Sequence, residues 1–250
     1  MSQNSIAIIG KNRLAEELVQ LCRNKGIKAT LHSGTGRVSP STSIAVETLA
    51  GHIEKKRQAI NRLDSVLRPS STILTSCLGF STTAIASWTK RPERVVGFAT
   101  FYPLKDKRMI ELARGLATRD DAINKAEELF RSMGKETAQV KDAPGLVFPR
   151  ILSLIINEAA RSLDEGVARA EEIDVAMQLG VNYPLGPLRW GDQIGLDEVL
   201  AVLEGLRQET GDSRYQPAPL LRKMVLSGRL GEISGRGFFQ YSSSLRSEHE

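Results

Sequence analysis

The first 22 residues narrow the kind of fold that this chain can adopt. Ser5–Gly10 is a short apolar run that ends in glycine, a pattern typical of a buried strand. Leu14, Leu18 and Leu21 follow at helical spacing, and Cys22 falls on the same apolar face, where we expect it in the core. A buried strand, a glycine turn and an amphipathic helix in this order predict the start of a parallel α/β sheet.

The alternation of strand and helix patterns continues along the first part of the chain. Further strands are expected at 27–31, 43–49, 73–77 and 95–101, and helices at 53–67 and 82–88. Gly34–Thr42 is rich in Gly, Ser, Thr and Pro and is predicted to be a loop. This part of the chain therefore predicts a parallel sheet with helices on its faces.

The pattern changes after Asp142. Four helices are expected at 151–166, 170–179, 195–209 and 219–227, and no strand pattern interrupts them. We therefore expect two domains, an α/β domain over residues 1–142 and an all-helical domain over residues 143–250.

Composition excludes several classes of protein. The chain is 41% hydrophobic and 25% charged, which is ordinary for a globular protein. Its net charge of +5 could suit a nucleotide or coenzyme A, or could reflect scattered solvated side chains. No arginine-rich arm, zinc spacing, signal peptide or run of 18 apolar residues is present. We therefore expect no nucleic acid, metal or membrane partner and a cytoplasmic location.

The first turn departs from the fingerprint of a dinucleotide site. That fingerprint, G-x-G-x-x-G, allows close approach to a pyrophosphate, but here the second glycine is replaced by Asn12 and the third by Ala15. The acid that should hold a ribose about 20 residues later is replaced by Ser33, which offers a weaker hydrogen bond. A turn with only a folding role and a nucleotide site assisted by Arg13 both remain open.

A set of motifs in the helical half resembles one enzyme family. In order, these are Asp142–Gly145, Asn157–Ala159, Ile173–Met177, Tyr183–Leu188, Gly195–Asp197 and Ser234–Tyr241. The set is similar to the C-terminal domain of the 3-hydroxyacyl-CoA dehydrogenases. The resemblance implies a reduced Rossmann-like sheet followed by a helical domain like the C-terminal one of 6-phosphogluconate dehydrogenase. The chain looks most like the second, degenerate module of bacterial 3-hydroxyadipyl-CoA or 3-hydroxybutyryl-CoA dehydrogenases. The family's helical excursion with its coenzyme A contacts is reduced here to Gly34–Thr42.

The resemblance also implies a reaction and its residues. The family uses NAD to oxidise 3-hydroxyacyl-CoA to 3-oxoacyl-CoA in fatty acid metabolism, with a His–Glu pair as the base. The glutamate is retained as Glu111, but the histidine position is Ala99 and the asparagine position is Pro149. The serine position is Leu78 or Gly79. The cofactor positions that the resemblance implies are Gly10, Asn12, Arg13, Ser33, Glu47 and Lys56.

Two candidate functions are compatible with these replaced positions. The first is a non-catalytic structural or acyl-CoA-binding module, in which Glu111 is a structural carboxylate bonded to backbone or arginine. Such a module would be a homodimer through apolar residues in 151–156 and 220–226, and could assist a catalytic paralogous module. The second is an active dehydrogenase with a rearranged site, for instance Tyr102 with Lys105 or Lys107 as a Tyr–Lys acid–base pair. None of the three histidines is expected near Glu111.

Overall fold

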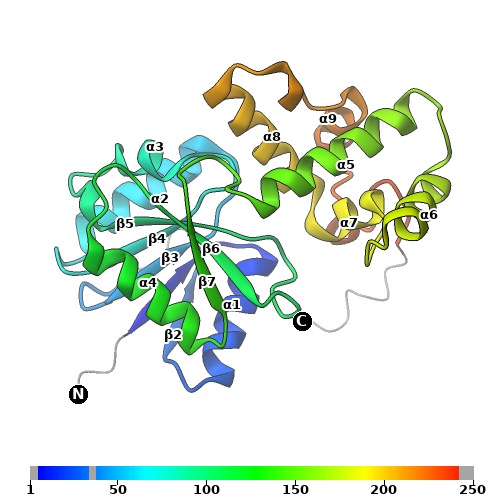
Figure 1. The fold of residues 1–250 in the computed structure, drawn as a ribbon. Coiled ribbons are helices and arrows are strands. Elements are labelled where there is room, and N and C mark those ends of the chain that lie inside the picture. The colour runs from blue at the N-terminus through cyan, green and yellow to red at the C-terminus, as the bar shows by residue number, and fades with distance from the viewer. Residues whose placement is uncertain (1–4, 34–37, 242–250) are drawn as a thin grey trace. The chain divides into compact units, whose positions relative to one another are not determined.

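A computed structural model describes residues 5–33 and 38–241, and these fall into two compact units. Unit 1 is Met1–Pro149 and unit 2 is Arg150–Glu250. Figure 1 shows a sheet with helices in unit 1 and helices alone in unit 2. Part of the predicted loop Gly34–Thr42, residues 34–37, lies outside the described residues, as does His249.

Unit 1 is built on one sheet, which has seven strands in the described residues, in the order β2-β1-β3-β4-β5-β6-β7. The strands are β1 (Ile6–Ile9), β2 (Ala29–His32), β3 (Ile44–Glu47), β4 (Thr72–Ser76), β5 (Val95–Ala99), β6 (Met109–Arg114) and β7 (Glu136–Val140). Every neighbouring pair is parallel except β5 and β6, which are antiparallel. From β1 the chain adds β2 on one side of the sheet and then returns to add β3 on the other side. The carboxyl end of β1 is therefore a topological switch point, where open α/β sheets bind their ligands.

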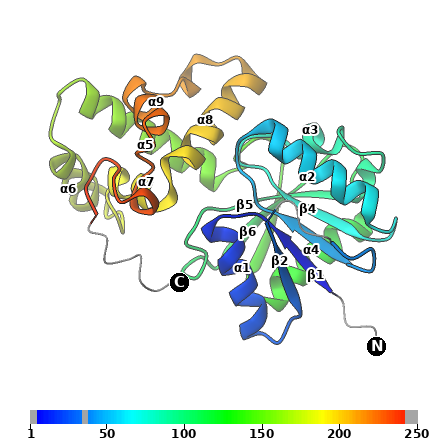
Figure 2. The ribbon, with the colours of Figure 1, turned by 180° about the vertical axis from the view of Figure 1, so that it is seen from behind.

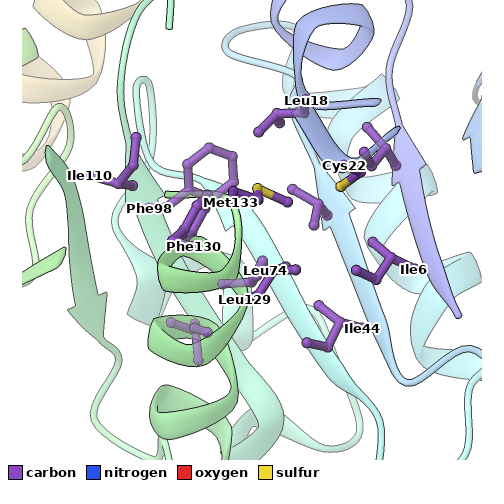
Figure 3. Packing of buried hydrophobic residues seen from close by; sticks show 14 of the residues in the cluster. Ile6, Leu18, Cys22, Ile44, Leu74, Phe98, Ile110, Leu129, Phe130 and Met133 are labelled. Carbon is purple, nitrogen blue, oxygen red and sulfur yellow. The ribbon is translucent and has the colours of Figure 1, made fainter. Parts of the chain in front are cut away.

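Helices cover both faces of this sheet, as Figures 1 and 2 show from opposite sides. They are α1 (Arg13–Asn24), α2 (Ile53–Val66), α3 (Thr82–Ala86) and α4 (Asp120–Ser132), with a 3-10 turn η1 (Pro92–Arg94). The main core lies under α1 and α4, where Leu18 and Phe130 pack with Leu74 and Phe98 of the central strands (Figure 3). Cys22 is fully buried in this cluster, as expected from its position on α1.

The reduced α/β sheet is confirmed, with three additions. Each strand and helix expected before residue 102 is present, although several are shorter. No element was expected at β6, α4 or β7. Charged residues disguise β6, and β7 is an edge strand whose residues are all exposed or half-buried. No helix occupies the described residues between β2 and β3. The strand β2 forms the other edge of the sheet, and its Leu31 is exposed.

Unit 2 contains helices and short turns in its described residues. They are α5 (Phe148–Asp164, which begins in unit 1), α6 (Ala170–Val181), α7 (Pro187–Ile194), α8 (Leu196–Thr210), η2 (Ser213–Tyr215), α9 (Pro219–Leu226) and η3 (Glu232–Ser234). All four predicted helices are present, and α7, which starts with proline, is an addition. None of the described helices is long and apolar enough to span a bilayer.

Buried carboxylates join the elements of unit 2. Asp192 on α7 accepts hydrogen bonds from the N–H groups of Phe238 and Phe239, both at 2.9 Å, and from the Tyr241 hydroxyl at 3.0 Å. Asp174 on α6 accepts from the first N–H groups of α7. These bonds satisfy buried backbone donors that would otherwise destabilise the fold.

Candidate functional site

The turn between β1 and α1 is closed by a side chain. Asn12 is the N-cap of α1, and its Oδ1 accepts a hydrogen bond from the N–H of Ala15 at 3.0 Å. Its Nδ2 donates to the carbonyl of Thr48 at 2.9 Å, and the Thr48 hydroxyl lies 3.0 Å from Oδ1. The carboxamide therefore bridges α1 to the residue that follows β3. Thr48 was not singled out from the sequence, although Asn before a helix is a recognised capping signal.

Gly10 retains an unusual backbone conformation in this turn. Its φ of +155° lies in a region that side chains rarely adopt, and an added Cβ would lie 2.1 Å from the Thr48 hydroxyl oxygen. The close approach that glycine permits is thus made by Thr48 of the same chain.

Glu47 and Lys56 are buried against each other. Lys56 Nζ donates to Glu47 Oε2 at 2.5 Å and to the carbonyl of Leu49 at 2.7 Å, and both side chains are fully buried. The other partners of Glu47 are the Leu49 N–H and the Thr75 hydroxyl, each at 2.6 Å. The pair fixes the carboxyl end of β3, and as folded it presents no charge to solvent.

The remaining cofactor positions lie at the same edge of the sheet. Ser33 follows β2 and is exposed. Arg13 is the first residue of α1, and its guanidinium lies 4.2 Å from the centre of the Tyr102 ring, a cation–π contact. The turn and these positions depart from the dinucleotide fingerprint, because the Thr48 hydroxyl lies against Gly10 and Ser33 stands where the ribose acid is expected.

The positions implied for the family's His–Glu pair lie side by side. Ala99 on β5 and Glu111 on β6 are directly opposed in the antiparallel register, so their Cβ atoms are about 5 Å apart on one face. Both residues are buried. A methyl group stands where the base would be, and it can neither accept nor donate a proton.

Glu111 is instead used as a helix cap. Its two oxygens accept hydrogen bonds from the N–H groups of Val147 and Phe148, each at 2.8 Å, at the start of α5. A carboxylate is favourable there because the first N–H groups of a helix have no intrahelical partner. The expectation that Glu111 is bonded to backbone is confirmed.

Two other positions that the resemblance implies for catalysis carry no acid–base side chain. Pro149, the second residue of α5, has no side-chain donor, and Leu78 is fully buried and aliphatic. Burial raises the pKa of the neighbouring Cys77 thiol to about 12, so it stays protonated at neutral pH. His32 is on β2, five strand spacings from β6, or roughly 24 Å.

The loop after β5 is fixed on both sides. Glu17 on α1 accepts from the backbone N–H groups of Leu104 and Lys105, both at 2.6 Å. Lys135 donates to the carbonyls of Leu104 and Lys107, at 2.7 and 2.5 Å. The ammonium of Lys107 donates to the Pro103 carbonyl, and the ring of Tyr102 lies against the guanidinium of Arg13. Glu17 and Lys135 were not identified from the sequence, because their partners are distant in the chain.

Comparison with known proteins identifies the family. A family model described as the C-terminal domain of 3-hydroxyacyl-CoA dehydrogenase matches residues 145–241. A second, described as the NAD binding domain of 3-hydroxyacyl-CoA dehydrogenase, matches residues 27–143, beginning after the turn between β1 and α1.

Individual relatives agree with these matches. The probable 3-hydroxybutyryl-CoA dehydrogenase of Bacillus subtilis (strain 168) is 37% identical over 241 residues, covering 93% of this chain and 84% of that protein. The 3-hydroxybutyryl-CoA dehydrogenase of Bradyrhizobium diazoefficiens is 39% identical over 198 residues, covering 79% of this chain and 68% of that protein. The crystal structure of (S)-3-hydroxybutyryl-CoA dehydrogenase from Ralstonia eutropha has a TM-score of 0.81 and 31% identity, and covers 97% of this chain and 100% of that one. The chain therefore belongs to the 3-hydroxyacyl-CoA dehydrogenase family.

Proposed function

We propose that this chain does not catalyse the NAD-dependent oxidation that its family implies, and that it is a structural or acyl-CoA-binding module. The observation that carries the proposal is the Ala99–Glu111 pair. The position implied for the base has no titratable group, and both oxygens of its partner are engaged by backbone at the start of α5. A positioned general base typically contributes about 10² to 10⁴ in rate, and the other implied catalytic positions also lack polar side chains.

Turnover and binding measured together test this proposal. Purified protein is mixed with acetoacetyl-CoA and NADH, and NADH absorbance is followed at high protein concentration. Calorimetry with acetoacetyl-CoA alone then measures whether a ligand groove remains. We expect no turnover above the rate without protein. Turnover that scales with protein concentration would contradict the proposal, whereas acyl-CoA binding without turnover would select the acyl-CoA-binding form of the module over the purely structural one.

A second candidate is an active 3-hydroxybutyryl-CoA dehydrogenase with a rearranged site. The names of the relatives at 37–39% identity favour it, since they match most of this chain. It requires an acid–base group other than Ala99, and Tyr102 is the polar residue of this region that the sequence suggested. If wild-type turnover is found, Tyr102→Phe tests which group transfers the proton, because loss of that turnover would assign the transfer to the phenol.

We also propose that the chain forms a homodimer through unit 2. Of the residues suggested from the sequence, Leu152, Ile156, Leu221 and Met224 are buried, whereas Ile151 and Leu226 are exposed. Further exposed apolar side chains of unit 2 are Val167, Val175, Leu179, Val181 and Ile233. A stable pair typically buries about 1,600 Å². Light scattering that gives the monomer mass at micromolar concentration would contradict the dimer.

Two further expectations remain proposals. A catalytic paralogous module as partner would be tested by co-purification with acetoacetyl-CoA-reducing activity. The cytoplasmic location would be tested by cell fractionation.

A further inference from the structure

We propose that Asn12 and Thr48 form an internal cap that takes the place of a dinucleotide pyrophosphate at the start of α1. This inference deepens the proposed function, because it names the side chains that exclude NAD. It concerns binding and not turnover, so each can fail without the other. It also assigns to Asn12 a role that a simple loss of glycine would not give it.

The cap satisfies one of the donors that a phosphate would use at the start of α1. Helix N-termini bind phosphate because their first N–H groups have no intrahelical partner. Here the Ala15 N–H, three residues into the turn, is already bonded to Asn12 Oδ1 at 3.0 Å. The Asn12 backbone is extended, with φ −144° and ψ 164°, which is the ordinary N-cap geometry. The side chain is therefore bonded inward, onto α1.

The cap also spans the switch point of the sheet. Thr48 follows β3, and its N–H donates to the carbonyl of Ile9 at the end of β1, 3.0 Å away. Asn12 Nδ2 donates to the Thr48 carbonyl, so one carboxamide connects α1 to the end of β3 across β1. In one bond the amide nitrogen donates to the Thr48 carbonyl, and in the other the amide oxygen accepts from the Ala15 N–H. These two roles fix the orientation of the Asn12 amide, because only its nitrogen can donate and only its oxygen can accept.

The Thr48 hydroxyl fills the remaining space. It lies 3.1 Å from the Ile9 carbonyl and 3.0 Å from Asn12 Oδ1, and an added Cβ on Gly10 would overlap it at 2.1 Å. The space beside Gly10, which the fingerprint leaves open for a ligand, is therefore filled by a side chain of the protein itself. A pyrophosphate could enter only by displacing the Asn12 carboxamide from all of these partners, so we infer that the domain is closed to NAD and folded without it.

Asn12→Gly, which restores the fingerprint glycine, tests the cap. Thermal unfolding is followed with and without NADH or ADP-ribose, the latter carrying the pyrophosphate without the nicotinamide. We expect the variant to unfold only about 1–2 °C lower than wild type, because glycine is itself tolerated at an N-cap, and to be stabilised by either ligand in a dose-dependent way. Wild-type protein should show no such stabilisation.

Two variants provide matched controls. Asn24→Gly makes the same change at the other end of α1, and should lower the Tm without creating a ligand response. Thr48→Val removes the hydroxyl but leaves the Asn12–Ala15 bond and the Asn12 bond to the Thr48 carbonyl. It should therefore remain silent to both ligands.

Three results would overturn the inference. They are ligand stabilisation of the wild-type protein, an Asn12→Gly variant that is destabilised but still silent, and rapid hydrogen exchange at the Ala15 amide of the wild-type protein. The exchange measurement is made on unaltered protein, so it decides the matter even if Asn12→Gly fails to fold.

Discussion

Replacing Glu111 separates a structural carboxylate from a catalytic one. The side chain is 4% exposed, and each of its oxygens accepts one backbone N–H at 2.8 Å. Hydrogen bonds to a charged group contribute about 1.5–3 kcal/mol each, so two set an upper limit of roughly 3–6 kcal/mol. Val147 is 45% exposed, and its N–H can bond water once the carboxylate is gone. We therefore expect Glu111→Ala to lower the free energy of unfolding by about 2–3 kcal/mol.

The conservative variant Glu111→Gln should lose less stability than Glu111→Ala. Glu111→Gln keeps the shape but presents an NH₂ group to one of the two N–H donors, so about 1–2 kcal/mol should be lost. Urea unfolding followed by circular dichroism measures both variants. Glu136→Gln on β7 is the matched control, because Glu136 makes only an exposed ion pair with Arg108 at 3.2 Å, which is worth less than about 1 kcal/mol.

A contrary result would be clear. If Glu111→Ala unfolds within about 0.5 kcal/mol of wild type, which is the effect of an ordinary surface substitution, the bonds to α5 do not stabilise the fold. If the variant is more stable than wild type, Glu111 is held in a strained functional arrangement. Either outcome would remove the main support for the non-catalytic module.

Three other substitutions have defined outcomes. Ala99→His should give no detectable reduction of acetoacetyl-CoA by NADH. Correct positioning of the reactants accounts for some 7–11 kcal/mol of barrier lowering, and the closed turn between β1 and α1 would not position the cofactor. Turnover in this variant, with an inactive wild-type protein, would refute the closed turn. Arg94→Met breaks the buried ion pair with Asp64 at 2.8 Å and should lower the free energy of unfolding by about 3–5 kcal/mol. If it loses no more stability than the exposed substitution Arg108→Met, this prediction is contradicted. Burial raises the pKa of Asp192 despite three hydrogen bonds that lower it, so the folded state binds this proton more tightly than the unfolded state does. Stability should therefore fall as pH rises above the ordinary aspartate pKa of about 3.9. Asp192→Asn should flatten this fall in pH-dependent unfolding, and an unchanged slope would contradict the prediction.

The sequence alone determined the architecture because its patterns are local. Apolar runs and helical spacing gave the parallel strands, the helices on their faces and the all-helical second half. The short stretch between His32 and Ile44 was enough to predict a reduced sheet, since it cannot hold a family-length excursion. Local patterns did not predict β6, α4 or β7. In the two strands, Glu111 and the polar residues of an edge strand hide the apolar signal.

The resemblance also gave the positions that the family uses for catalysis and for cofactor binding, but not what the residues at these positions do here. Glu47 and Lys56 were candidates for cofactor binding, and only the folded chain buries them against each other. In the sequence Asn12 is only a departure from the dinucleotide fingerprint, whereas the structure bonds it to Ala15 and Thr48. These outcomes depend on contacts between residues up to 36 positions apart, and such contacts form only when the sheet order brings the ends of β1 and β3 together. Sequence spacing records which side chains are available, and tertiary structure decides whether their hydrogen bonds go to a ligand or to the protein itself.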